Sequence, residues 1–145
     1  MTDSKSSTGH HAAGNIFLLK GIMKTITALM LMMITMADQP RKVLLFYNAE
    51  GEQQWKAQMK VLEAARKEVS ERDIEITSVP GSARYADQWK KWKIDTSEAF
   101  TFILIGRDGG EKLRSNEMVK TNQLFGLIDA MPMRKREMES EHEKP

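Results

Sequence analysis

Short apolar runs, each bounded by turn-forming residues, recur along the chain and predict the strands of a sheet. The first run is 42–48 (KVLLFYN), the second is 74–79 (IEITSV), and the third is 100–105 (FTFILI). A tight turn at 107–110 follows, and its Asp-Gly pair suits the positive φ angles of a hairpin. The pattern therefore predicts a fourth, antiparallel strand at 111–114.

Between the first three runs, apolar residues recur at steps of three and four, which predicts two amphipathic helices. The first should follow Gly51 and end near Arg72. Its apolar face holds Trp55, Met59, Leu62, Ala65 and Val69. The second should begin at Ser82, a good N-cap, and end at Ile94. Its apolar face holds Tyr85, Trp89 and Trp92.

A last helix is expected over residues 121–131, and Pro132 should stop it or lie just beyond it. Its inward face holds Leu124, Leu127, Ile128 and Met131. The charged segment 137–145 has one large apolar residue, Met138, and we expect it to be a frayed or disordered tail.

The predicted order is βαβαββα, an α/β domain over residues 41–136 with a four-stranded mixed sheet and helices on both faces. A helix joins the first two strands, so they should be parallel, with a right-handed crossover. This is the thioredoxin-like plan. We place four residues in its core: Trp55, Trp89, Leu104 and Ile128.

The N-terminal region predicts export. Residues 26–37 (ITALMLMMITMA) are uncharged, follow Lys20 and Lys24, and end in a small residue suited to cleavage. A membrane anchor is the rival interpretation, but a span needs about 20 apolar residues. We therefore expect a signal peptide at 23–37 and no stable membrane span after cleavage, with a periplasmic or secreted product. Residues 1–22 are either a disordered extension or an overcalled start, since Met23 begins a compact leader.

Composition narrows the chemistry. The chain has no cysteine, which removes disulfides, thiolate metal sites and cysteine nucleophiles. His10 and His11 precede the leader and His142 is near the C-terminus, so no histidine is expected in a triad. From Asp38 onward acidic and basic residues balance, and no strong field draws the domain to nucleic acid or an anionic membrane. We predict no cofactor and no metal.

Two segments carry a more specific likeness. The stretches FILIGRDGGEKLRS (102–115) and LFGLIDAMPMRKREM (124–138) resemble a family of bacterial exported proteins classed as a domain of unknown function. That family looks like a thioredoxin or peroxiredoxin relative, and it is similar to domains of secreted sushi-repeat-containing matrix proteins. The resemblance implies a fold and an exported setting, without an activity.

The resemblance also shows what has been lost. Thioredoxins place a Cys-x-x-Cys pair after the first strand, where this chain has Gly51-Glu52-Gln53-Gln54. They place a cis-proline before the third strand, where this chain has Phe100. A cis bond before a residue other than proline costs about 2.5–4 kcal/mol, so we expect this bond to be trans.

The candidate site is the carboxyl end of the first strand, where ligands of α/β sheets bind. Asn48, Glu50 and Glu52 lie there, with Phe100 and Arg114 as neighbours. They could form a small polar binding pocket where the thiols once were. The alternative is an N-cap with acidic residues favoured by the helix dipole.

Three other motifs have simpler interpretations. The aromatic stripe with Lys90, Lys91 and Lys93 resembles a single-strand nucleic-acid clamp, but helical spacing favours packing on the sheet. The basic run Arg134–Arg136 could bind an anion, yet the following glutamates balance it. The turn at 107–110 (RDGG) could pass for a phosphate-binding glycine loop, but it lacks the phosphate-loop pattern and lies between two strands.

These observations favour a non-catalytic binding or interaction module with a protein or peptide partner. One alternative is a non-thiol enzyme that uses Glu50 or Glu52 with Arg114 or another basic group as an acid–base pair. Another is a structural or stress protein without a small ligand.

Overall fold

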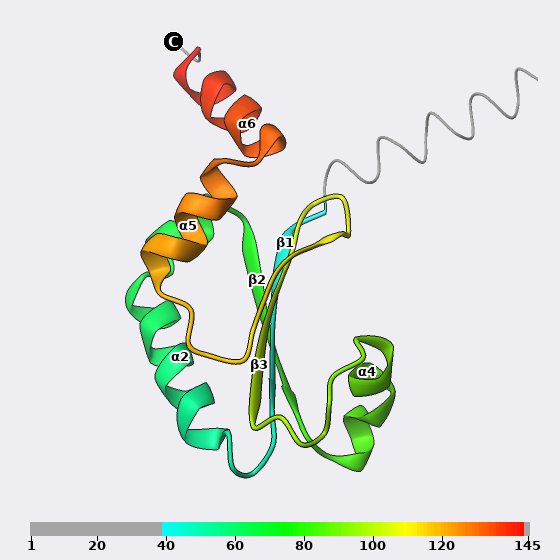
Figure 1. Cartoon of the computed structure of the whole chain (residues 1–145). Helices are drawn as coiled ribbons and strands as arrows, with labels where there is room; N and C mark the ends of the chain where they lie inside the picture. The colour runs from blue at the N-terminus through cyan, green and yellow to red at the C-terminus, as the bar shows by residue number, and fades with distance from the viewer. Residues whose placement is uncertain (1–38, 144–145) are drawn as a thin grey trace, which may run out of the picture. The chain divides into compact units, whose positions relative to one another are not determined.

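The computed structural model describes residues 39–143 (Figure 1). The predicted leader, 23–37, and the extension, 1–22, lie outside these residues. The elements are β1 (Arg41–Tyr47), α2 (Glu52–Ala64), α3 (Arg66–Glu71), β2 (Ile74–Pro80), the short 3₁₀ helix η1 (Ala83–Tyr85), α4 (Ala86–Lys91), β3 (Phe100–Ile105), β4 (Glu111–Ser115), α5 (Thr121–Asp129) and α6 (Pro132–His142).

The four strands form one sheet in the order β2-β1-β3-β4. β1 runs parallel to β2 and antiparallel to β3, and β3 and β4 form the predicted antiparallel hairpin. Leu44 of β1 lies between Thr77 of β2 and Ile103 of β3. This order and these directions are those of the predicted thioredoxin-like α/β plan, which is therefore confirmed.

Helices cover both faces of the sheet, with α2 and α5 on one side and α4 on the other (Figure 1). Side chains of β3 alternate between the two layers: Phe102 and Leu104 pack toward α2 and α5, whereas Ile103 and Ile105 pack toward α4. All six residues of β3 are buried, because a central strand covered on both faces has no solvated side.

Three of the four predicted core residues are buried: Trp89, Leu104 and Ile128. The fourth, Trp55, is half-buried at the edge of the α2–α5 core. Its ring stacks on Tyr47 with centroids 4.5 Å apart, and its indole N–H donates to Ser78 Oγ at 2.9 Å. Burial of its ring while its N–H keeps a partner is the usual behaviour of tryptophan.

The first predicted helix is two helices. Ala65 separates α2 from α3, and its amide donates to Leu62 O, three residues back, rather than four. The apolar spacing continues in phase through this tight turn, so the break left no sign in the periodicity.

The prediction that residues from Glu137 onward are frayed or disordered is wrong as far as His142. α5 ends at Asp129, so Pro132 lies just beyond that helix, and it begins α6. Met131 is extended (φ −69°, ψ 138°), which suits the residue before a proline, and the first turn of a helix needs no proline N–H. α6 is mostly polar and has no continuous apolar face, so composition alone does not predict the contacts that stabilise it.

In the part of the chain that the structure describes, no helix is both long enough and apolar enough to cross a bilayer. Every peptide bond in that part is trans, including the predicted one before Phe100.

Candidate functional site

The parallel strands β1 and β2 end at the same edge of the sheet, with Tyr47 opposite Pro80. Asn48 follows β1, and Gly81 follows β2 and donates its amide to Tyr47 O at 2.7 Å. Ligands of open α/β sheets bind beyond such carboxyl ends. Any pocket here is therefore the first place to look for a binding site.

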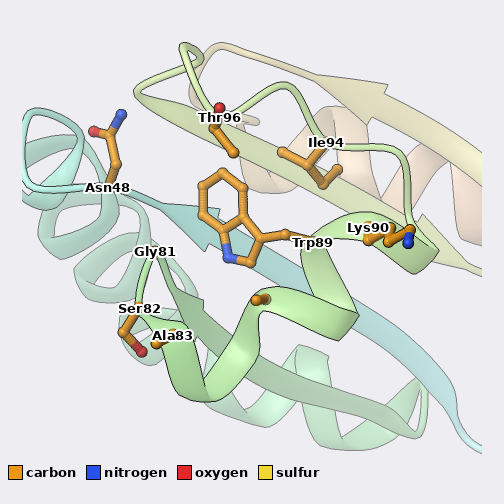
Figure 2. A pocket seen from close by; sticks show the side chains of 9 residues that line it. Asn48, Gly81, Ser82, Ala83, Trp89, Lys90, Ile94 and Thr96 are labelled. Carbon is orange, nitrogen blue, oxygen red and sulfur yellow. The ribbon is translucent and has the colours of Figure 1, made fainter.

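A pocket of about 370 Å³ lies at this edge, on the α4 side of the sheet (Figure 2). Its volume is within the range of small-ligand sites. It is lined by Asn48, Gly81, Ser82, Ala83, Ala86, Trp89, Lys90, Ile94 and Thr96. In Figure 2 the Trp89 ring lies between the segment that carries Ser82 and Ala83 and the loop that carries Ile94 and Thr96.

Trp89 is held in place from two directions. Its ring meets Phe46 of β1 edge-on, with centroids 5.6 Å apart and planes at 89°. Its indole N–H donates to Pro80 O at 3.2 Å, and the residue is only 5% exposed. The pocket therefore has a fixed aromatic wall, whose position follows from packing against the sheet.

Asn48 positions the backbone around the pocket. Its Oδ1 accepts hydrogen bonds from the amides of Glu50 (2.9 Å) and Gly51 (3.1 Å), and its Nδ2 donates to Glu98 O (3.3 Å). These bonds fasten the end of β1 to the first turn of α2 and to the loop before β3. The predicted N-cap role is wrong, since Gly51 is the N-cap of α2 and no side chain caps that helix. Asn48 instead forms an Asx turn ahead of α2, and the same residue also lines the pocket.

Gly51 lies at the position where, by the resemblance to thioredoxins, the first cysteine of a redox pair is expected, and this position is closed to side chains. It is buried, and a Cβ built on it would lie 1.7 Å from the carbonyl oxygen of Ala99. The backbone before β3 passes so close that no side chain fits there. The first position of the 51–54 quartet is thus packed against backbone rather than open to a ligand.

The other four predicted residues do not meet in one pocket. Glu50 is exposed, and Glu52 pairs with Lys56 at 2.7 Å on the surface of α2. Phe100 is the first residue of β3 and is buried in the core, with 1% of its surface exposed.

Arg114 has a different place and different partners. It lies on β4, the edge strand beyond β3, and pairs with Glu111 at 2.7 Å. It also donates to Trp92 O at 3.0 Å, which ties the end of α4 to β4. Of the five predicted residues, only Asn48 lines the pocket. Phe100 is near Asn48 in the sheet, since it pairs with Tyr47, the residue before Asn48.

Shifted carboxyl groups in the described range are all stabilised as anions. Hydrogen bonds from Arg114 lower the pKa of Glu111, and the same pairing raises the pKa of Arg114. Hydrogen bonds from the amide and then the hydroxyl of Ser97 lower the pKa of Asp95, beside the pocket residue Thr96. A general acid at neutral pH needs the opposite shift, so these carboxylates suit anchoring rather than proton donation.

Within residues 39–143, no group of three or more histidine, aspartate and glutamate side chains is placed to hold a metal ion.

The pocket residues contributed by β2 and α4 were missed from the sequence. Pro80-Gly81-Ser82 follows the second strand as Asn48 follows the first, and parallel pairing brings both to one edge. The Pro-Gly-Ser turn after the second strand therefore marks the second half of the site in the sequence. The aromatic stripe behaves as predicted, since Trp89 packs on the sheet while Lys90, Lys91 and Lys93 are exposed.

Comparison with known proteins gives a family but little beyond it. A family model described as a domain of unknown function, DUF4174, matches residues 33–137. No curated protein matches the chain.

Two solved structures are similar to this chain. One is described as a malarial protein, with 19% identity over 63% of this chain and 96% of that chain, and a TM-score of 0.49. The other is the reduced 2-Cys peroxiredoxin of Plasmodium vivax, with 16% identity over 67% and 80% of the two chains, and a TM-score of 0.48. Both TM-scores are below 0.5, so the fold assignment rests on the strand order and directions.

Proposed function

Since the chain belongs to the DUF4174 family, a domain of unknown function, we propose a function from its own site. The domain is a non-catalytic binding module that takes an apolar side chain of an extended peptide or protein segment into the pocket beside Trp89.

The observation that carries this proposal is the make-up of the pocket wall. Trp89 and Ile94 give it a buried apolar floor, and Lys90 is its one ionisable lining residue among those described. Ser82 and Thr96 supply hydroxyls at the same pocket. An apolar floor with a few polar groups is the usual design of a site that binds by shape and orients its ligand by hydrogen bonds.

A peptide suits this pocket better than a free ion or a charged metabolite. The described domain carries almost no net charge, and a single lysine would meet an anion without a second cation to clamp it. The Ser82 and Thr96 hydroxyls match the amide groups that flank an apolar side chain in a peptide.

The enzyme alternative lacks an assembled acid–base pair. Glu52 is bonded to Lys56, and Arg114 is bonded to Glu111 and to a backbone carbonyl. Glu50 is exposed and is not among the residues lining the pocket.

We place this module outside the cytoplasm of a bacterium. The support is the sequence of the predicted leader at 23–37, together with the resemblance to exported proteins and to secreted sushi-repeat-containing matrix domains.

The test starts from random peptides displayed on phage, selected against residues 38–145. Selected peptides are synthesised and titrated into labelled protein while the indole N–H signal of Trp89 is followed by NMR. We expect peptides with one large apolar residue to be enriched and to shift that signal in a saturable way.

A pocket-filling variant gives the control. Ala86 is exposed and lines the pocket, so Ala86→Leu should fill it and weaken peptide binding at least tenfold. Ala64→Leu, at an exposed position at the end of α2, should leave binding unchanged. Failure to enrich any peptide, or equal binding by both variants, would contradict the proposal.

A further inference from the structure

Four arginines converge at the other end of the sheet, where β1 begins. Arg41 opens β1, Arg72 follows α3, Arg107 lies in the β3–β4 turn, and Arg134 is in the first turn of α6. Arg41 is 1% exposed and Arg134 7%, and the side chains of Arg107 and Arg72 are 13% and 15% exposed. Guanidinium groups so poorly exposed to water need compensating charge.

Glu137 of α6 is the centre of this arginine cluster. Its carboxylate accepts hydrogen bonds from Arg41 (3.0 and 3.2 Å), Arg107 (2.8 Å) and Arg134 (3.4 Å). One carboxylate thus serves three guanidinium groups.

Two further carboxylates complete the charge count. Asp129 pairs with Arg72 at 2.7 Å and lies 3.6 Å from Arg134. Asp73 pairs with Arg107 at 3.0 Å, but its side chain is more than half exposed. The arginine cluster therefore holds four cations against three anions and keeps one unit of positive charge.

Hydrogen-bond donors are left over as well. The Nε atoms of Arg41 and Arg134 are buried and have no hydrogen-bond partner in the described structure. A buried donor without an acceptor is rare in native proteins and needs an explanation.

A pocket of about 330 Å³ opens beside the arginine cluster. It is lined by Arg41, Gly106, Arg107, Asp108, Lys112, Leu127, Ala130, Met131, Pro132 and Met133. Asp108 is bonded to Lys112 at 2.6 Å, so that pair is neutral, and the two arginines provide the remaining charge. Leu127, Met131 and Met133 contribute the apolar part of the wall.

We propose that this pocket binds a small organic carboxylate. Its carboxylate would lie at Arg41 and Arg107, and its apolar part would cover Leu127, Met131 and Met133. One carboxylate neutralises the single excess charge of the arginine cluster and offers an acceptor to Arg41, the lining residue whose buried Nε has no partner. Inorganic phosphate carries more negative charge than is needed to neutralise the one excess positive charge of the arginine cluster. It would also leave the apolar wall uncovered.

This pocket is separate from the one beside Trp89. Asn48 and Gly81 follow the carboxyl ends of β1 and β2, whereas Arg41 begins β1 and Gly106 follows β3, which runs antiparallel to β1. The inference therefore stands independently of the proposed peptide site.

Hexanoate is the probe, titrated into residues 38–145 while the Gly106 amide and Met131 and Met133 methyl signals are followed by NMR. Hexanol tests the need for the charge, and inorganic phosphate tests the need for the apolar part. We expect saturable shifts with hexanoate and at least tenfold weaker effects with the other two. Equal binding of hexanol or phosphate, or no saturable shift with hexanoate, would overturn the proposal.

Variants locate the binding. Among residues 39–143, the exposed large apolar residues are Leu127 and Met118, with exposed fractions of 36% and 41%. Leu127→Glu should repel hexanoate and weaken it at least tenfold, while Met118→Glu should not. Ala130→Leu serves as a second variant in case Leu127→Glu disturbs the fold. It fills the pocket without adding charge and should weaken hexanoate binding by the same factor. Unchanged binding in folded Leu127→Glu or Ala130→Leu protein would place hexanoate elsewhere and refute the inference. Ala86→Leu, which acts on the peptide pocket, should leave hexanoate binding intact.

Discussion

Arg41 and Glu137 are 96 residues apart in the sequence, yet the guanidinium of the first donates two hydrogen bonds, of 3.2 and 3.0 Å, to the carboxylate of the second. Arg41 begins the central strand β1, and Glu137 lies in the polar helix α6. The pair therefore joins the end of the domain to the start of its sheet. α6 offers little apolar surface, so this contact is a main reason for the helix to dock.

Glu137→Gln should destabilise the domain by about 2 kcal/mol. Removing one partner of a buried ion pair typically costs about 3–5 kcal/mol, and we reduce this because Glu137 is partly exposed. Urea unfolding of residues 38–145, followed by circular dichroism, measures the change. Glu139→Gln, at an exposed position of the same helix, should change the unfolding free energy by less than about 0.5 kcal/mol. Similar losses in both variants would contradict a special role for Glu137.

The same pair predicts a pH dependence. Burial raises the pKa of Glu137, but hydrogen bonds and charge from Arg41 and Arg107 outweigh it and hold the pKa below the ordinary value of a glutamate. A carboxyl whose pKa is lowered on folding stabilises the folded state above its unfolded pKa. That contribution is lost as the pH falls through the lower, folded value.

Unfolding measured at pH 6, 4 and 3 tests this dependence. The unfolding free energy of the wild type should fall toward that of Glu137→Gln as the pH drops from 6 to 3, because the stabilisation is lost when the carboxylate of Glu137 is protonated. Comparing the two proteins removes the contribution of the other carboxylates. A difference that stays constant from pH 6 to pH 3 would show that Glu137 does not titrate as described.

The sequence predicted the strands better than the ends of the molecule. Residues 100–105 coincide with β3, because a buried central strand is apolar throughout and turn residues bound it. α6 could not be predicted in the same way, since Glu137 finds Arg41 only in the folded chain. The pocket beside Trp89 was half predicted, because its β2 side depends on strand pairing rather than on any local pattern.

Gly51→Ala should be strongly unfavourable. Its new Cβ would lie 1.7 Å from Ala99 O, so the backbone before β3 must move, and overpacking of this kind costs about 1–3 kcal/mol. Gly126, inside α5, has nothing within 4 Å of a built Cβ. Gly126→Ala should therefore stabilise the domain by about 0.5–1 kcal/mol, since alanine favours the helix. Thermal unfolding of both variants measures the two changes in stability. Equal changes in the two variants would refute the close approach at Gly51.

The leader prediction can be checked on the protein from cells. The uncharged run 26–37 and the small residue Ala37 place the mature N-terminus near Asp38. Mass spectrometry of protein from an envelope fraction should find a chain that begins there. An intact N-terminus at Met1 or Met23 would contradict cleavage.

The mature domain should neither reduce insulin disulfides nor consume peroxide through a thiol. Thiol–disulfide exchange requires a thiolate to attack sulfur and a second thiol to resolve the mixed disulfide, and this chain contains no cysteine. Methionine cannot replace cysteine, because a thioether forms no thiolate. The structure adds a geometric reason, since backbone blocks any side chain at Gly51, where the resemblance to thioredoxins would place the first cysteine. Turnover above that of a heat-inactivated control, surviving a second purification and abolished by a change at Asn48 or Glu50, would mean that the site performs chemistry after all.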